Sequence, residues 1–65
     1  MRNNLRVLRA VKDISQEQLA EELGVTRQTI HAVENDKYNP SLDLAFKMAH
    51  YFDKSIEEIF LYDEE

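Results

Sequence analysis

Cysteine is absent from the sequence, and glycine and proline occur once each among its 65 residues. The lack of cysteine excludes a disulfide framework and a thiolate metal site. The scarcity of glycine and proline argues against an all-β fold, which needs many tight turns. No apolar run approaches the roughly 20 residues that span a membrane, and the first residues do not resemble a signal peptide. We expect one small, soluble, cytoplasmic domain over residues 1–65, with no membrane partner.

Negative charge is unevenly distributed along the chain, whose net charge is −5. Residues 1–41 contain six cations and six anions, whereas residues 42–65 contain two cations and seven anions. With 43% apolar and 32% charged residues, the composition is that of a globular protein. A polyanionic partner would therefore meet the first two thirds of the chain, with the acidic end directed away from it.

Apolar residues recur at the spacing of amphipathic helices along most of the chain. In the first such segment they are Leu5, Leu8 and Val11, with Val7 beside them. In the fourth they are Leu42, Ala45, Met48, Ala49 and Phe52. The predicted fold class is all-α, with five short helices at about residues 4–12, 16–23, 27–34, 42–52 and 56–60. The segment 60–62 is compatible with a short strand or a frayed end, and the sequence does not decide between them.

Several of the predicted helices carry their own start or stop signals. Ser15 and Gln18 have the spacing of a capping box, in which each side chain bonds to the main-chain N–H of the other residue. Ser55 and Glu58 repeat this spacing. The single glycine, Gly24, follows the second predicted helix, where a residue in the left-handed conformation commonly ends a helix. Further N-caps are expected at Thr26 and Ser41.

The connection between the second and third predicted helices is very short, since only Gly24, Val25 and Thr26 separate them. Two helices so joined cannot pack antiparallel along their full lengths, so we expect the third to leave at a steep angle. Their apolar residues would then share one core, made of Leu19, Leu23, Val25, Ile30 and Val33. This arrangement is a helix-turn-helix.

A steep crossing leaves one face of the third helix free. That face carries Arg27, Gln28 and His31, with Asn35 at its end. Glutamine can bond the N6 and N7 atoms of adenine together, and arginine can bond O6 and N7 of guanine. We therefore expect this face to read base pairs of double-stranded DNA.

The middle of the chain contains four motifs: Ser-Gln-Glu-Gln-Leu-Ala at 15–20, Gly-Val-Thr-Arg-Gln-Thr-Ile at 24–30, Glu-Asn at 34–35 and Asn-Pro-Ser-Leu at 39–42. In these motifs the sequence resembles the phage-repressor (Cro/C1-type) helix-turn-helix family, and within it the compact, stand-alone dimeric members. The similarity covers nearly the whole chain and is most specific over residues 15–42. It implies a lambda-repressor-like five-helix bundle, a small β-ribbon joining the two termini, and a twofold dimer.

The resemblance also implies roles for individual residues. The base-reading positions of the family fall on Arg27, Gln28 and His31. Its phosphate-contacting positions fall on Gln16, Asn35, Lys37 and Asn39. Arg9 and Glu34 correspond to a partly buried ion pair that ties the first helix to the third. The implied function is a homodimeric, nucleoid-associated repressor that binds a dyad operator through the major groove, with no cofactor and no small-molecule ligand.

The end of the chain is richer in apolar residues than one short helix can bury in so small a bundle. Core closure accounts for Ile59 and Phe60, whereas Ile56, Leu61 and Tyr62 are better explained by a partner subunit. Two copies related by a dyad can also read half-sites about 34 Å apart. We therefore expect a homodimer formed through these last three residues.

Other functions are less favoured by the sequence. An antitoxin uses the same helix-turn-helix, but the sequence ends soon after the predicted bundle and leaves little to wrap a toxin. Ser41-Leu42-Asp43 faintly resembles the Asp-Ser-Leu site of an acyl carrier protein, yet Pro40 stands where the first aspartate is expected. The only histidines, His31 and His50, have no metal-binding neighbours, so no metal site is expected. No catalytic triad or phosphate-binding loop is present, and we expect no enzyme.

Overall fold

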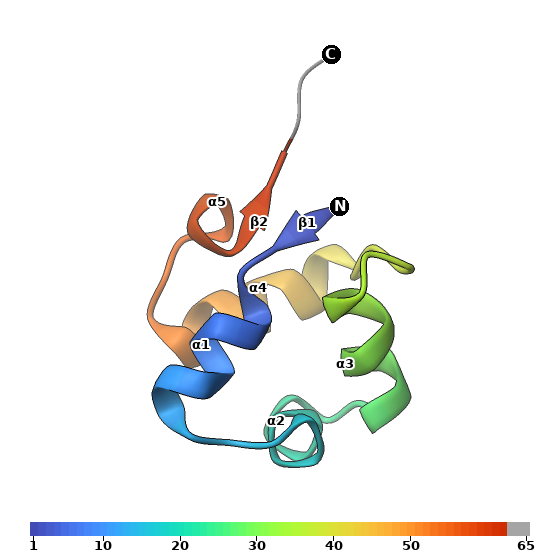
Figure 1. Cartoon of the computed structure of the whole chain (residues 1–65). Helices are drawn as coiled ribbons and strands as arrows, with labels where there is room; N and C mark the ends of the chain where they lie inside the picture. The colour runs from blue at the N-terminus through green and yellow to red at the C-terminus, as the bar shows by residue number, and fades with distance from the viewer. Residues whose placement is uncertain (63–65) are drawn as a thin grey trace.

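The computed structural model describes residues 1–62, which form five helices and one two-stranded sheet (Figure 1). The helices are α1 (Leu5–Lys12), α2 (Gln16–Leu23), α3 (Arg27–Glu34), α4 (Leu42–Phe52) and α5 (Ile56–Ile59). The strands β1 (Arg2–Asn3) and β2 (Phe60–Leu61) pair antiparallel. The all-α prediction is confirmed, and the segment that the sequence left undecided begins as a strand. Residues 63–65, part of the acidic end, lie outside the described residues.

Side-chain caps explain why the helices begin where they do. Ser15 Oγ accepts from the Gln18 main-chain N–H at 3.0 Å, and Gln18 Oε1 accepts from the Ser15 N–H at 2.8 Å. Ser55 and Glu58 form the same reciprocal pair at the start of α5. Further caps come from Thr26, which accepts from the Thr29 N–H, and Ser41, which accepts from the Leu44 N–H. Each predicted cap is present, so local chemistry alone sets these boundaries.

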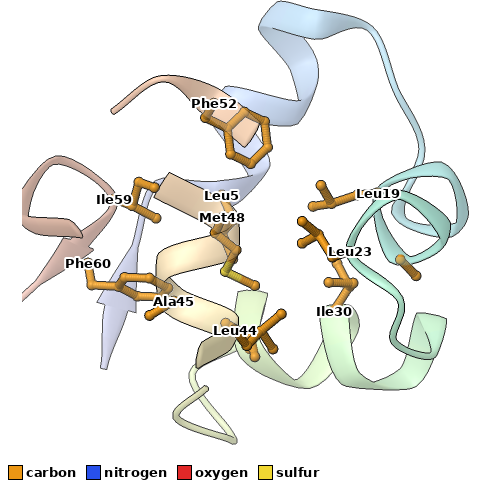
Figure 2. Close-up of a cluster of buried hydrophobic side chains, with 12 residues drawn as sticks. Leu5, Leu19, Leu23, Ile30, Leu44, Ala45, Met48, Phe52, Ile59 and Phe60 are labelled. Carbon is orange, nitrogen blue, oxygen red and sulfur yellow. The ribbon is translucent and has the colours of Figure 1, made fainter. Parts of the chain in front are cut away.

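A single apolar core lies between the helices (Figure 2). Leu5 and Met48 are fully buried near its centre, with side chains from α2, α3 and α5 around them. The α2 and α3 contributions are Leu19, Ala20, Leu23, Ile30 and Val33. The end of the chain adds Ile59 and Phe60, the two residues expected to close the core. This core holds α3 by its inner face.

The predicted apolar stripe of α1 is partly wrong. Leu5 is buried and Leu8 packs against the core, but Val11 is 78% exposed and Val7 is 60% exposed. The reason is that Arg9 occupies the inward position next to Leu5 and Leu8, at the i, i+3, i+4 spacing of one helix face. The valines consequently lie on the outer side of the helix.

The predicted stripe of α4 needs one correction as well. Leu42 is 70% exposed, whereas Leu44, which the stripe omitted, is 6% exposed and belongs to the core. Leu42 is the first residue of α4 and lies beyond the core, where it lines a groove with Ile56 and Phe60. An apolar side chain is thus left at the surface beside the terminal strands.

The short turn between α2 and α3 produces the expected crossing. Gly24 adopts a left-handed conformation with φ of 72°, which ends α2 and redirects the chain. Figure 1 looks along α2 but across α3, so the two axes cross steeply. In the same view α5 and β2 lie at the opposite side of the molecule from α2, and the end of α3 comes close to β1. None of the helices in residues 1–62 has both the length and the apolar character to cross a bilayer.

Candidate nucleic-acid interface

The outer face of α3 is a row of polar side chains. Ile30 and Val33 anchor the inner face with exposed fractions of 0% and 1%. Arg27, Gln28 and His31 are exposed on the other side of the same helix. Because two turns of helix carry them, their side chains project from one rigid rod. The structure therefore brings together the three side chains that the sequence predicted as base readers.

The remaining predicted DNA-contacting residues flank this face. Gln16 begins α2 and is half-buried, while Asn35 follows the last residue of α3. Lys37 and Asn39 are exposed on the loop that leads to α4. The first main-chain N–H groups of a helix have no partner inside that helix, so the start of α2 offers donors suited to a phosphate oxygen.

The loop after α3 is held by main-chain and side-chain hydrogen bonds. Asn35 Nδ2 donates to the carbonyl oxygen of His31 at 2.8 Å, and the Lys37 N–H donates to the Ala32 carbonyl at 2.9 Å. Asp36 has a positive φ of 60°, which reverses the chain at this point. From the N-terminal strand, Asn3 Nδ2 donates to the Val33 carbonyl at 2.8 Å. Lys37 and Asn39 are therefore displayed from a braced loop.

Arg9 and Glu34 form a bidentate ion pair between α1 and α3. Arg9 Nε donates to Glu34 Oε2, and Arg9 Nη2 donates to Glu34 Oε1 at 3.0 Å. The Glu34 side chain is 0% exposed and that of Arg9 is 16% exposed. A third N–H of Arg9 donates to the Ile14 carbonyl at 3.0 Å. All three nitrogens of the guanidinium thus donate a hydrogen bond, which compensates for the burial of the ion pair.

The environment of Glu34 stabilises its charged form. Burial by itself would raise the pKa of this carboxyl group. Hydrogen bonds from Arg9 and Gln16, together with the charges of Arg9 and Arg6, outweigh burial and lower the pKa below its ordinary value. The hydrogen bond to Glu34 conversely raises the pKa of Arg9. Glu34 is therefore an ionised anchor beneath the polar face of α3.

Gln16 connects this anchor to the exposed face. Its Nε2 atom donates to Glu34 Oε1 at 3.0 Å and also lies 3.5 Å from His31 Nδ1. The connection joins the first residue of α2 to the fifth residue of α3. Sequence reasoning had placed Gln16 and His31 in separate roles and had not linked either one to the ion pair.

Arg6 is a residue that the sequence analysis did not single out. Its side chain is 67% exposed and lies 3.8 Å from Glu34 Oε1, and its Nη2 atom donates to Asn35 Oδ1 at 3.5 Å. A cation therefore stands beside the loop that carries Lys37. The sequence signal that could have identified Arg6 is its position three residues before Arg9, which puts both arginines on the same side of α1.

The residues predicted for a partner subunit are not on α3, but the groove that Ile56 lines also includes Asn39 of the flanking loop. Ile56 and Leu61 are half-buried and Tyr62 is 75% exposed. Ile56 shares a groove with Pro40 and the exposed Leu42. The apolar surface is thus larger than the sequence indicated, and it includes the start of α4.

Comparison with known proteins agrees with the fold. A family model described as helix-turn-helix matches residues 5–59. An uncharacterised HTH-type transcriptional regulator of Methanocaldococcus jannaschii is 52% identical over 65 residues, covering 100% of this chain and 98% of that protein. The uncharacterised HTH-type transcriptional regulator YgzD of Bacillus subtilis is 46% identical over 65 residues, with coverages of 100% and 98%.

A solved structure shows the same architecture. The hypothetical transcription factor NHTF from Neisseria matches with a TM-score of 0.77 and 34% identity over 85% of this chain. The chain spans 62% of the length of that protein. This chain belongs to the helix-turn-helix family. More closely, it is of the Cro/C1 type, a group of DNA-binding transcriptional regulators and not of enzymes.

Proposed function

We propose that the chain is a single helix-turn-helix domain over residues 1–65 that represses transcription by binding a dyad operator as a homodimer, in the cytoplasm on the nucleoid. The observation that carries this proposal is the exposure of Arg27, Gln28 and His31 on one face of a helix whose opposite face is fixed in the core. A helix so displayed fits the major groove, where each base pair presents a distinct pattern of donors and acceptors.

Sequence reading is assigned to the three α3 side chains. Arg27 and Gln28 stand at the start of the helix, the part that reaches base edges in helix-turn-helix proteins. Each offers two polar atoms in one plane, which suits bidentate contacts to guanine and adenine, respectively. His31 lies one turn further along and contacts a neighbouring base pair.

Orientation on the duplex is assigned to the flanking residues. Lys37 and Asn39 project from the braced loop, and Asn35 ends α3 beside them. Gln16 contributes the main-chain N–H at the first position of α2, since its side-chain amide is already bonded to Glu34. Contacts of this kind fix register on the phosphate backbone and carry no sequence information of their own.

Dimerisation is assigned to the apolar surface at the other end of the molecule. We assign it Ile56, Leu61 and Tyr62 together with Leu42: Leu42 and Ile56 line one groove with Phe60, and Leu61 and Tyr62 follow Phe60 in the chain. Exposed apolar side chains such as Leu42 and Tyr62 favour burial against a second copy. A twofold dimer places two α3 helices about one helical turn of DNA apart, and such a dimer bound at a promoter blocks polymerase.

Matched substitutions test the dimer surface. Leu42→Asp and Tyr62→Asp, made separately, are expected to convert the dimer to a monomer in sedimentation experiments. Val11→Asp is the control, because Val11 is 78% exposed but lies on the outer side of α1. A wild-type protein that sediments as a monomer at micromolar concentration, or a dimer unaffected by both substitutions, would contradict this assignment.

Selection of bound duplexes from random-sequence DNA tests the function itself. The wild-type chain is expected to enrich a sequence with twofold symmetry and half-sites about 34 Å apart. Enrichment of a sequence without symmetry would contradict the dyad, and no enrichment at all would contradict sequence-specific binding. Transcription in vitro from a promoter that overlaps the selected site then distinguishes repression from activation.

A further inference from the structure

The contacts around His31 indicate which ring nitrogen carries the hydrogen. Gln16 Nε2 lies 3.0 Å from a carboxylate oxygen of Glu34, and a carboxylate can only accept. The Gln16 amide must therefore turn its nitrogen, not its oxygen, toward Glu34. That same nitrogen lies 3.5 Å from His31 Nδ1, so it presents a donor to the ring.

Asn35 presents a second donor to the same ring. Its Nδ2 atom donates to the His31 carbonyl at 2.8 Å, and a carbonyl oxygen can only accept, so the orientation of this amide is fixed as well. Arg6 Nη2 donates to Asn35 Oδ1 at 3.5 Å, which agrees with that orientation. Asn35 Nδ2 lies 3.4 Å from both ring nitrogens of His31.

Two amide donors directed at one imidazole require a lone pair on the ring. Asn35 lies equally far from the two ring nitrogens, whereas Gln16 approaches Nδ1, so Nδ1 is the nitrogen placed to accept a hydrogen bond from Gln16. A neutral imidazole with a lone pair on Nδ1 carries its hydrogen on Nε2. This hydrogen then belongs to the ring nitrogen that Gln16 does not approach.

We propose that Gln16, anchored on the buried Glu34, is a positioning residue for His31 and sets its ring to present the Nε2 hydrogen to the DNA. The side chain consequently reads a hydrogen-bond acceptor in the major groove. Guanine and thymine offer acceptors at O6 and O4, and both purines offer N7, whereas the groove edge of cytosine offers an amine. His31 therefore excludes cytosine from the base that it contacts. This inference rests on the proposed function, because it concerns the reading of an operator.

If Gln16 positions His31, removing its side chain changes base preference; if its role is purely structural, removal changes stability alone. Gln16→Ala leaves the bidentate contacts between Arg9 and Glu34 in place, and the backbone of α2 with its capping box also remains. The fold is thus retained while the ring loses one of its two amide partners. Glu17→Ala is the matched control, because Glu17 is the next residue of the same helix and is exposed.

The experiment measures the affinity of the full chain for the selected operator and for every single base-pair substitution in one half-site. The proteins compared are wild type, His31→Ala, Gln16→Ala, the double variant and Glu17→Ala. His31→Ala is expected to reduce discrimination at one base pair by about fivefold, the equivalent of one hydrogen bond. At that base pair the wild type is expected to rank cytosine last on the contacted strand.

Gln16→Ala is expected to reduce discrimination at the same base pair by at least about twofold, in protein that remains folded at the temperature of the titration, while Glu17→Ala leaves discrimination as in the wild type. The double variant is expected to discriminate no less than His31→Ala does, since Gln16 acts through the ring. Three results would overturn the proposal. Gln16→Ala could keep the base preference of the wild type at that base pair, the losses of the two single variants could add in the double variant, or the wild-type protein could prefer cytosine there. If selection enriches no sequence, the proposed function fails instead, so the two failures are distinguishable.

Discussion

The two ends of the molecule expose side chains of opposite chemistry. At the end formed by α2 and α3, exposed polar groups such as His31 are tied through Gln16 to the buried, ionised Glu34. At the end formed by α5, the terminal strands and the start of α4, the exposed side chains include the apolar Leu42 and Tyr62. One end is prepared for a polar, hydrogen-bonding partner and the other for an apolar one. The proposed DNA-binding and self-association surfaces therefore use different side chains and meet only at the loop that carries Asn39.

The largest loss of stability is expected from removing Glu34, the buried carboxylate that supports the polar end of the molecule. Glu34→Ala leaves the Arg9 guanidinium, which is 16% exposed, without its counterion. Removing one partner of a buried ion pair costs about 3–5 kcal/mol, and each kcal/mol lowers the melting temperature of a small domain by roughly 4–8 °C. Thermal unfolding followed by circular dichroism measures this loss.

An exposed pair in the same protein is the control for that measurement. Asp43 and Lys47 lie 3.4 Å apart with side chains that are 81% and 52% exposed. Asp43→Ala is expected to cost about 0.3–0.5 kcal/mol. Equal losses for the two substitutions would show that Glu34 is not a stabilising anchor.

The next largest effect separates reading from orientation within the polar end. Gln28→Ala is expected to weaken binding to the selected operator by about 1–3 kcal/mol and to relax the preference at one base pair. Lys37→Ala is expected to weaken binding to all sequences alike, because a phosphate contact is independent of sequence. Titrations with the operator and with a scrambled duplex distinguish the two patterns. Equal loss on both duplexes for both variants would refute these roles.

A smaller effect is expected from the two capping boxes, one at each end of the molecule. Ser15→Ala and Ser55→Ala each remove a hydroxyl that accepts a main-chain N–H, which costs about 1 kcal/mol. Only Ser15→Ala is expected to change DNA affinity at concentrations where the protein is fully dimeric, because Ser55 starts α5 at the other end. Urea unfolding and operator titration measure the two quantities. A change in operator preference caused by Ser55→Ala would contradict the assignment of DNA binding to the end formed by α2 and α3.

The smallest effect is expected in the pH dependence of stability. The pKa of Glu34 is lowered in the folded protein, so its contribution is complete above the ordinary value of 4.5. That contribution is lost as the pH falls below 4.5 and through the lowered value, because protonation then removes the favourable ion pair. The stability difference between wild type and Glu34→Gln is therefore expected to shrink in acid and stay constant near neutrality. A difference that grows on acidification would contradict the assigned sign.

Local signals were sufficient to predict most of the fold. The caps at Ser15 and Ser55 and the left-handed Gly24 determine helix boundaries through contacts within a few residues, so they can be recognised in a sequence. The exposed face of α3 could be predicted for a similar reason. Ile30 and Val33 mark its inner side, which leaves Arg27, Gln28 and His31 outside.

Contacts between distant segments could not be predicted in the same way. Val11 matched an apolar stripe but is exposed, because the inward position of that helix belongs to Arg9 and its partner on α3. The link from Glu34 through Gln16 to His31 joins two helices by side-chain rotamers, and no spacing in the sequence encodes it. Sequence patterns thus predicted which residues of α3 face outward, and the structure was needed to show how those residues are held.

The central claim is that the outer face of α3 and its flanking loop form the DNA-binding surface. Amide chemical shifts of the labelled protein, followed by NMR during titration with the selected operator, test this claim most directly. The account predicts the largest changes at the proposed contact residues: Gln16, Arg27, Gln28, His31, Asn35, Lys37 and Asn39. Changes centred instead on the outer side of α1 around Val7 and Val11, with α3 unaffected, would contradict it.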